Sequence, residues 1–92
     1  MDRIKNIKKM EAYLDETSEV IRRLETAISD FSNAQKKLSV LEAYYSSGEW
    51  RADYEADERG ELPDDLKRGV LSEDALYDLL VDNERLKKLL GE

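Results

Sequence analysis

Apolar side chains recur three and four residues apart along the first half of the chain, from Ile4 to Tyr45. This spacing predicts an α-helix with one apolar face. No glycine or proline occurs before Gly48, so nothing obliges the helix to end earlier. The polar cluster at residues 29–33 is the only place where a break in the helix would be expected. The sequence therefore predicts one long N-terminal helix, about 63 Å in length at about 1.5 Å per residue.

The apolar face of this helix is wider than the seam of a two-stranded coiled coil. In a heptad frame that takes Ile7 as position a, only Thr17 and Gln35 are clearly polar among the a and d sites. The a sites are Ile7, Leu14, Ile21, Ile28 and Gln35, the d sites are Met10, Thr17, Leu24, Phe31, Leu38 and Tyr45, and the g sites are Tyr13, Val20, Ala27, Ala34 and Leu41. A stripe of about three residues in seven is typical of a bundle, so more than one helix should pack against it.

The b and c sites carry charges that alternate in sign from one heptad to the next. These pairs are Lys8-Lys9, Asp15-Glu16, Arg22-Arg23, Ser29-Asp30 and Lys36-Lys37. Residues seven apart do not touch, and an exposed pair three or four residues apart contributes only a few tenths of a kcal/mol. A solvated outer face accounts for the pattern, and the alternative is that the alternation fixes the register of a neighbouring helix.

Turn and capping signals divide the second half of the chain into shorter elements. A short helix is expected near residues 47–58, because Ser46 and Glu49 have the spacing of a capping box. Residues 63–68 predict another very short helix, in which Leu66 would face inward.

The last helix is expected at residues 73–90. Ser72 would be its N-cap, and Leu71 would close a hydrophobic staple with Leu76. The predicted fold class is all-α, a single helical domain over residues 1–92. It comprises the long N-terminal helix, one or two short helices in a middle segment, and a C-terminal helix packed back on the first, as a helical bundle or in a coiled-coil-like arrangement.

The shorter helices cannot cover the whole stripe of the first. By the same rise per residue, residues 47–58 and 73–90 would extend about 18 Å and 27 Å, against about 63 Å for the long helix. A long exposed apolar strip usually marks a partner. We therefore expect a homo-oligomer, most simply a two-fold symmetric dimer that is either parallel or antiparallel.

Composition removes several classes of chemistry. The 92 residues contain no cysteine and no histidine, which excludes disulfides, thiolate ligands, and the commonest general base and metal ligand. No glycine-rich phosphate loop occurs. We expect no enzymatic activity, no cofactor and no metal site.

The formal net charge of −7 lies entirely in the second half of the chain. Residues 1–45 hold 8 basic and 8 acidic side chains, whereas residues 46–92 hold 7 basic and 14 acidic ones. The acidic half would repel a phosphate backbone, so no nucleic-acid partner is expected. No apolar run approaches the roughly 18 residues of a membrane span, so we expect no membrane partner and a cytoplasmic location.

The middle segment concentrates the aromatic residues. Four of the seven in the chain lie close together, namely Tyr44, Tyr45, Trp50 and Tyr54. They are expected to pack the short helices against Leu38, Leu41 and Leu79 as core. The alternatives are a stacking platform for a ligand and a patch that binds a partner protein. Candidates for such a surface are Trp50, Tyr54, Lys67 and Arg68.

Seven acidic side chains between residues 53 and 65 raise the hypothesis of a calcium or magnesium site. Their spacing does not fit an EF-hand loop, because Glu58 stands where a glycine is required. Lys67 and Arg68 precede a helix start and could attract an anion, although two carboxylates follow them. A solvated acidic face is preferred, and the alternative is a small regulator that binds a metal ion or anionic ligand through this segment.

The run from Tyr44 through Leu80, which begins with the block YYSSGEWRADYEADERGELPDDLKRGVLSED, closely resembles a family of short bacterial proteins described only as a domain of unknown function. The matching pieces include Glu49-Trp50, Asp53-Tyr54-Glu55, Leu62-Pro63 and the run from Lys67 to Asp74. The resemblance implies a bacterial, soluble, all-helical protein with no assigned activity, so no catalytic residue carries over. We therefore favour a non-enzymatic helical interaction or structural module that self-associates.

Overall fold

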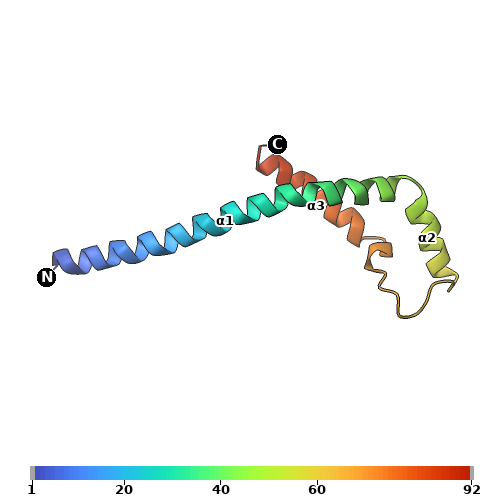
Figure 1. Cartoon of the computed structure of the whole chain (residues 1–92), viewed down its shortest axis with the longest axis horizontal. Helices are drawn as coiled ribbons and strands as arrows, with labels where there is room; N and C mark the ends of the chain where they lie inside the picture. Colours follow the sequence, from blue (N-terminus) through green and yellow to red (C-terminus); the bar gives the residue numbers. More distant parts are fainter. Residues whose placement is uncertain (1, 92) are drawn as a thin grey trace. The chain divides into compact units, whose positions relative to one another are not determined.

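The computed structural model describes residues 2–91, and the regular elements among these residues are helices, with no strand, which confirms the all-α prediction. The elements are α1 (Asp2–Ser46), α2 (Glu49–Glu58), the 3₁₀ helix η1 (Gly69–Leu71) and α3 (Ala75–Leu89) (Figure 1). None of the helices in residues 2–91 combines the length and apolar character that a membrane span requires. The chain divides into two compact units, Met1–Gln35 and Lys36–Glu92. The expectation of a single domain stays a prediction.

The predicted long helix is continuous. α1 spans 45 residues and runs through the polar cluster at residues 29–33 without a break, because no glycine or proline interrupts it. In the described part of the first unit no side chain is buried. Nine large apolar side chains of α1 each expose between 42% and 58% of their surface: Ile4, Ile7, Met10, Tyr13, Leu14, Val20, Ile21, Leu24 and Ile28. The apolar stripe of this unit therefore faces solvent in the single chain.

The second unit has a small core to which all of its elements contribute. Trp50 of α2, Leu71 of η1 and Leu76 of α3 are buried together. Partly buried neighbours pack around them, namely Leu41, Tyr44, Tyr45, Tyr54, Leu62 and Leu80. Since Leu41, Tyr44 and Tyr45 belong to the last turns of α1, the C-terminal helix and the end of the first helix share one core, as predicted.

The chain turns between α1 and α2 at Gly48. Its φ of 91° lies in the left-handed region, which glycine adopts without the steric cost of a Cβ atom. Gly48 also occupies the N-cap position of α2, and the Ser47 hydroxyl accepts a bond of 3.4 Å from the amide of Glu49. The short helix is therefore confirmed, but the capping box predicted at Ser46 is wrong.

The very short helix predicted at residues 63–68 is wrong. Only a turn forms there, closed by a bond of 3.2 Å from the Leu66 amide to the Pro63 carbonyl oxygen. That oxygen also accepts a bond of 2.6 Å from the Arg68 guanidinium, which competes with the amide needed to continue a helix. Leu66 was expected to face inward but is 46% exposed. Helical structure begins instead at Gly69, in η1.

The C-terminal helix begins two residues later than predicted, at Ala75. The predicted N-cap, Ser72, donates its amide to the Gly69 carbonyl oxygen at 3.1 Å and so completes η1 instead. Asp74 takes the N-cap position. The predicted contact partners Leu71 and Leu76 are nevertheless both in the core.

The buried face of α3 is centred on Leu76 and Asn83. Leu80 lies about 40° around the helix from Leu76, on the side away from Asn83, and packs on the core. Leu79 was expected in the core but is 45% exposed, because it lies about 60° around the helix from Leu76. The helix ends beyond Leu89, where Gly91 adopts a left-handed conformation with φ of 82°.

We predict that Leu76→Ala destabilises the second unit by about 2 to 5 kcal/mol, because Leu76 is 3% exposed and its removal leaves a cavity in a small core. Leu89→Ala is the matched control on the same helix, and since Leu89 is 75% exposed, the change should stay within about 0.5 kcal/mol. Urea unfolding can be followed through the fluorescence of the single tryptophan, Trp50, which lies in that core. Equal losses in the two variants would contradict this assignment of the core.

Candidate interaction surface

Trp50 is the centre of the aromatic cluster and is 9% exposed. Its ring stacks on Tyr54, with centroids 5.1 Å apart, and meets Tyr45 edge-on at 5.2 Å. The indole Nε1 donates a hydrogen bond of 2.8 Å to the Val70 carbonyl oxygen, which joins α2 to η1. The cluster is therefore packed as core, and Trp50 is the least accessible of the four residues proposed for a partner surface.

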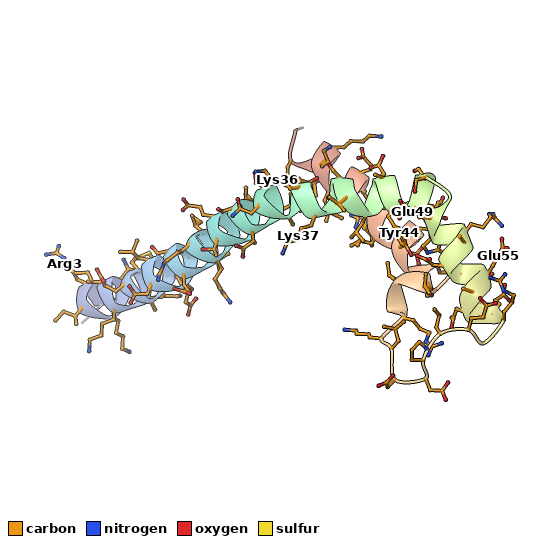
Figure 2. All side chains as sticks on the ribbon, turned by 45° about the vertical axis from the view of Figure 1, so that its right-hand side comes forward. Arg3, Lys36, Lys37, Tyr44, Glu49 and Glu55 are labelled. Atoms are coloured by element: carbon orange, nitrogen blue, oxygen red, sulfur yellow. The ribbon has the colours of Figure 1, made fainter. Side chains whose placement is uncertain are left out.

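Two tyrosines at the border of this core bind carboxylates. The half-buried Tyr54 donates its hydroxyl to Glu73 at 2.6 Å, which joins α2 to the segment before α3. This hydrogen bond, followed by burial and nearby carboxylates, raises the pKa of Tyr54 to about 12. Tyr44 donates to Asp53 at 2.6 Å, and burial and this bond raise its pKa to about 12. Glu49, which also projects from α2 (Figure 2), adds to the shift of Tyr44.

Arg68 holds the loop between α2 and η1. Its guanidinium forms an ion pair with Asp57 of α2 and donates to the carbonyl oxygens of Pro63 at 2.6 Å and Leu66 at 3.3 Å. The side chain is 30% exposed, so water screens these contacts only in part. Arg68 therefore acts within the fold, whereas Lys67 beside it is exposed. No spacing rule relates Asp57 to Arg68, so sequence reasoning missed the pair.

Three of the seven acidic residues between residues 53 and 65 are engaged in such contacts. Asp53 binds Tyr44, Asp57 binds Arg68, and Glu61 pairs with Arg59. The hydrogen bond from Arg59 lowers the pKa of the Glu61 carboxyl. Within residues 2–91 no three carboxylates converge on a position that could hold a metal ion. This geometry gives the metal-binding alternative no support.

An open apolar groove of about 870 Å³ lies between the end of α1 and α3. Its apolar lining comes from Tyr45, Tyr77, Leu80, Val81 and Leu89. Charged residues border it, namely Glu42, Glu84, Arg85 and Lys88. Sequence reasoning did not single out Tyr77 or Val81, although their spacing of four on one helix was a signal for a shared face.

The family model described as "Domain of unknown function (DUF4298)" matches residues 7–90, which include the whole second unit except its last residues. No curated protein and no solved structure matches the chain.

We predict that Arg68→Ala destabilises the second unit by about 1 to 2 kcal/mol, since it removes hydrogen bonds from a charged donor and leaves the half-buried Asp57 without its cation. Arg68→Lys should restore only part of this loss, because an ammonium cannot reproduce the planar fork. Arg59→Ala is the control and should change stability much less, because the Arg59–Glu61 pair is 55% exposed on both sides and is screened by water. Urea unfolding measures all three, and an effect of Arg59→Ala as large as that of Arg68→Ala would argue against this role.

Alkaline pH should unfold the second unit partly through Tyr54. Because its folded pKa is about 12 and the ordinary value is 10, its contribution to stability is complete below pH 10 and is lost as pH rises through 12. Tyr54→Phe should therefore lower the melting temperature at neutral pH but reduce its further fall between pH 10 and 12. In an absorbance titration at 295 nm, Tyr54→Phe and Tyr44→Phe should each remove part of the phenolate signal near pH 12. An unchanged signal in both variants would refute the assignment.

Proposed function

The chain belongs to the DUF4298 family, whose description assigns no activity, and we propose that it is a non-enzymatic helical interaction module that self-associates through α1. The observation that carries this proposal is the run of exposed apolar side chains on α1, from Ile4 to Ile28. Monomeric proteins rarely leave a contiguous apolar strip of this length in water.

The energetics of an isolated helix support this proposal. Most helical stability in proteins comes from packing of an apolar face against other elements. In residues 2–35 of α1, no buried side chain supplies such packing. Burial of one Leu or Ile contributes about 1.5 to 3 kcal/mol, so covering this face would stabilise the helix substantially. A second copy of the chain offers the same face, and two-fold dimers are the commonest assembly of identical chains.

The chemistry of the second unit favours a binding role over catalysis. The carboxylates of Asp53, Asp57 and Glu61 are each engaged with a hydroxyl or guanidinium group. General acid and base work needs two titratable groups in contrasting environments around a substrate site. With histidine and cysteine absent from the sequence, an interaction module is the simpler function. The cytoplasmic location, the bacterial origin and the lack of nucleic-acid and membrane partners stay predictions.

We predict that the protein sediments as a dimer at micromolar concentration and that Leu24→Lys weakens the dimer about 100-fold or more. Leu24 is 57% exposed in the single chain, and the substitution would place two ammonium groups in the apolar interface. Thr26→Lys is the matched control, because Thr26 lies on the opposite face of the same turn.

Sedimentation equilibrium of the two variants beside the unaltered chain measures this difference. A monomeric mass of the unaltered chain at micromolar concentration would refute self-association. Equal weakening by Leu24→Lys and Thr26→Lys would show that the apolar face of α1 is not the contact surface.

A further inference from the structure

The border of the apolar stripe of α1 carries a charge pattern that self-association alone does not explain. The stripe includes the a, d and g sites, and around the helix the c site lies next to g, about 40° away. The c sites are therefore at the edge of the surface that a partner would cover. Along residues 7–31 they are Lys9, Glu16, Arg23 and Asp30, which alternate in sign.

The part of the stripe that needs cover ends near residue 30. Ile7, Leu14, Ile21 and Ile28 at the a sites are 42% to 58% exposed. Phe31, the next d site, is half-buried, and so is Leu38 after it. The surface to be matched is therefore the stretch that contains the four alternating c sites.

We propose that two copies of this chain pair antiparallel along residues 7–31 of α1, with the two-fold axis near Glu19 and Val20. Lys9 then faces the partner's Asp30, and Glu16 faces the partner's Arg23. This inference rests on the proposed self-association and adds its orientation and register.

The same register also matches the apolar residues. A face of a, d and g sites is centred on d, so each d site of one copy meets a d site of the other: Met10 lies against the partner's Phe31, Thr17 against the partner's Leu24, and Val20 at a g site meets the partner's Val20 near the axis. Thr17 is the only polar residue among them, and its hydroxyl already donates a hydrogen bond of 2.7 Å to the Tyr13 carbonyl oxygen of its own helix. It can therefore enter the interface without an unsatisfied donor.

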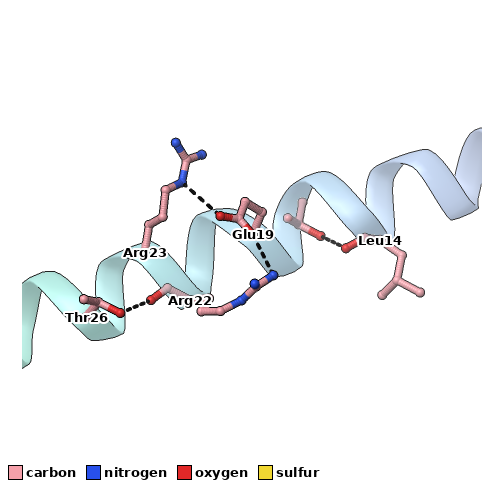
Figure 3. Close-up of polar contacts among 6 residues, drawn as sticks. Leu14, Glu19, Arg22, Arg23 and Thr26 are labelled. Carbon is pink, nitrogen blue, oxygen red and sulfur yellow. Dashed lines mark hydrogen bonds and ion pairs between the residues drawn. The ribbon is translucent and has the colours of Figure 1, made fainter.

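The charges at the c sites are available for such contacts. Within the described chain, Glu19 binds Arg22 at 2.6 Å and lies 4.0 Å from Arg23 (Figure 3). The contact with Arg23 is long, and both of its side chains are largely exposed, so it competes weakly with a partner. Lys9, Glu16 and Asp30 form no ion pair with any of residues 2–91.

The charges favour the antiparallel orientation over the parallel one. Flanking sites of the same type face each other in an antiparallel pair, so alternation about a central axis joins opposite signs. In a parallel pair the c sites would face e sites, whose only charged members along this stretch, Glu11 and Glu25, offer no cation to Glu16 or Asp30. A parallel pair would also bring together two copies of residues 3–9, which hold four basic and no acidic side chains. The apolar contacts give affinity, and the charges select the orientation.

Spin-label distances test the orientation directly, because the chain contains no cysteine. Asn6→Cys labels should lie about 40 Å apart in the antiparallel dimer, since each is about 13 residues from the axis. In a parallel dimer they would be separated by little more than the interaxial distance of about 10 Å. Ser18→Cys, close to the axis, should give a short distance in either orientation and serves as the labelling control.

The mass of the same samples separates the two proposals. A monomeric mass overturns self-association and this inference with it. A dimeric mass with a short Asn6 distance overturns the antiparallel register alone. A dimeric mass with an Asn6 distance near 40 Å supports both.

Charge reversal tests the register. Glu16→Arg and Arg23→Glu should each weaken the dimer about tenfold, and the double variant should recover most of this loss, because it restores opposite signs across the interface. Arg22→Glu is the control, since it also removes a partner of Glu19 but lies at a b site. The double variant Glu16→Arg with Arg22→Glu should keep the weakened dimer affinity. Recovery with Arg22→Glu, or its absence with Arg23→Glu, would overturn the pairing.

Discussion

The dominant constraint on this protein is an apolar helix face that its own chain leaves in water. α1 is continuous over 45 residues, and its large apolar side chains are exposed up to Ile28. A helix of this kind gains little from its own backbone hydrogen bonds and depends on packing for stability. The first unit therefore presents an exposed apolar face, whereas the second unit has a core of its own.

The second unit compensates for a small core with polar contacts at its border. Only Trp50, Leu71 and Leu76 are buried apolar residues within the described chain. Bonds from Trp50 to Val70, from Arg68 to Asp57 and from Tyr54 to Glu73 each connect α2 to the segment that follows it. Long polar side chains thus fix a loop in which there are few apolar contacts. This division matches composition, since charged residues are as frequent in the chain as hydrophobic ones, at 40% each.

The elements that could be predicted from sequence are those set by local rules. Apolar periodicity and the absence of breakers fixed the course of α1, and the crowding of aromatics before residue 55 indicated the core around Trp50. The errors lie where the chain forms turns and 3₁₀ hydrogen bonds that compete with the expected helix starts. The Arg68 guanidinium donates to the Pro63 carbonyl oxygen within the turn at residues 63–68. The Ser72 amide donates to the Gly69 carbonyl oxygen of η1, so Ser72 does not serve as the N-cap of α3. Leu79 was wrongly placed in the core because it and its neighbour Leu80 fit the apolar periodicity equally well. Only the burial of Leu76 shows which of the two faces the core.

Gly48 has a consequence for how the length of this protein can vary. The left-handed turn at Gly48 ends α1, and the core beyond it takes only the last turns of that helix, at Leu41, Tyr44 and Tyr45. Whole heptads can therefore be inserted into or deleted from the earlier part of α1 while the residues around Trp50 keep their places. The length of the first part of α1 can therefore change independently of the fold of the second unit.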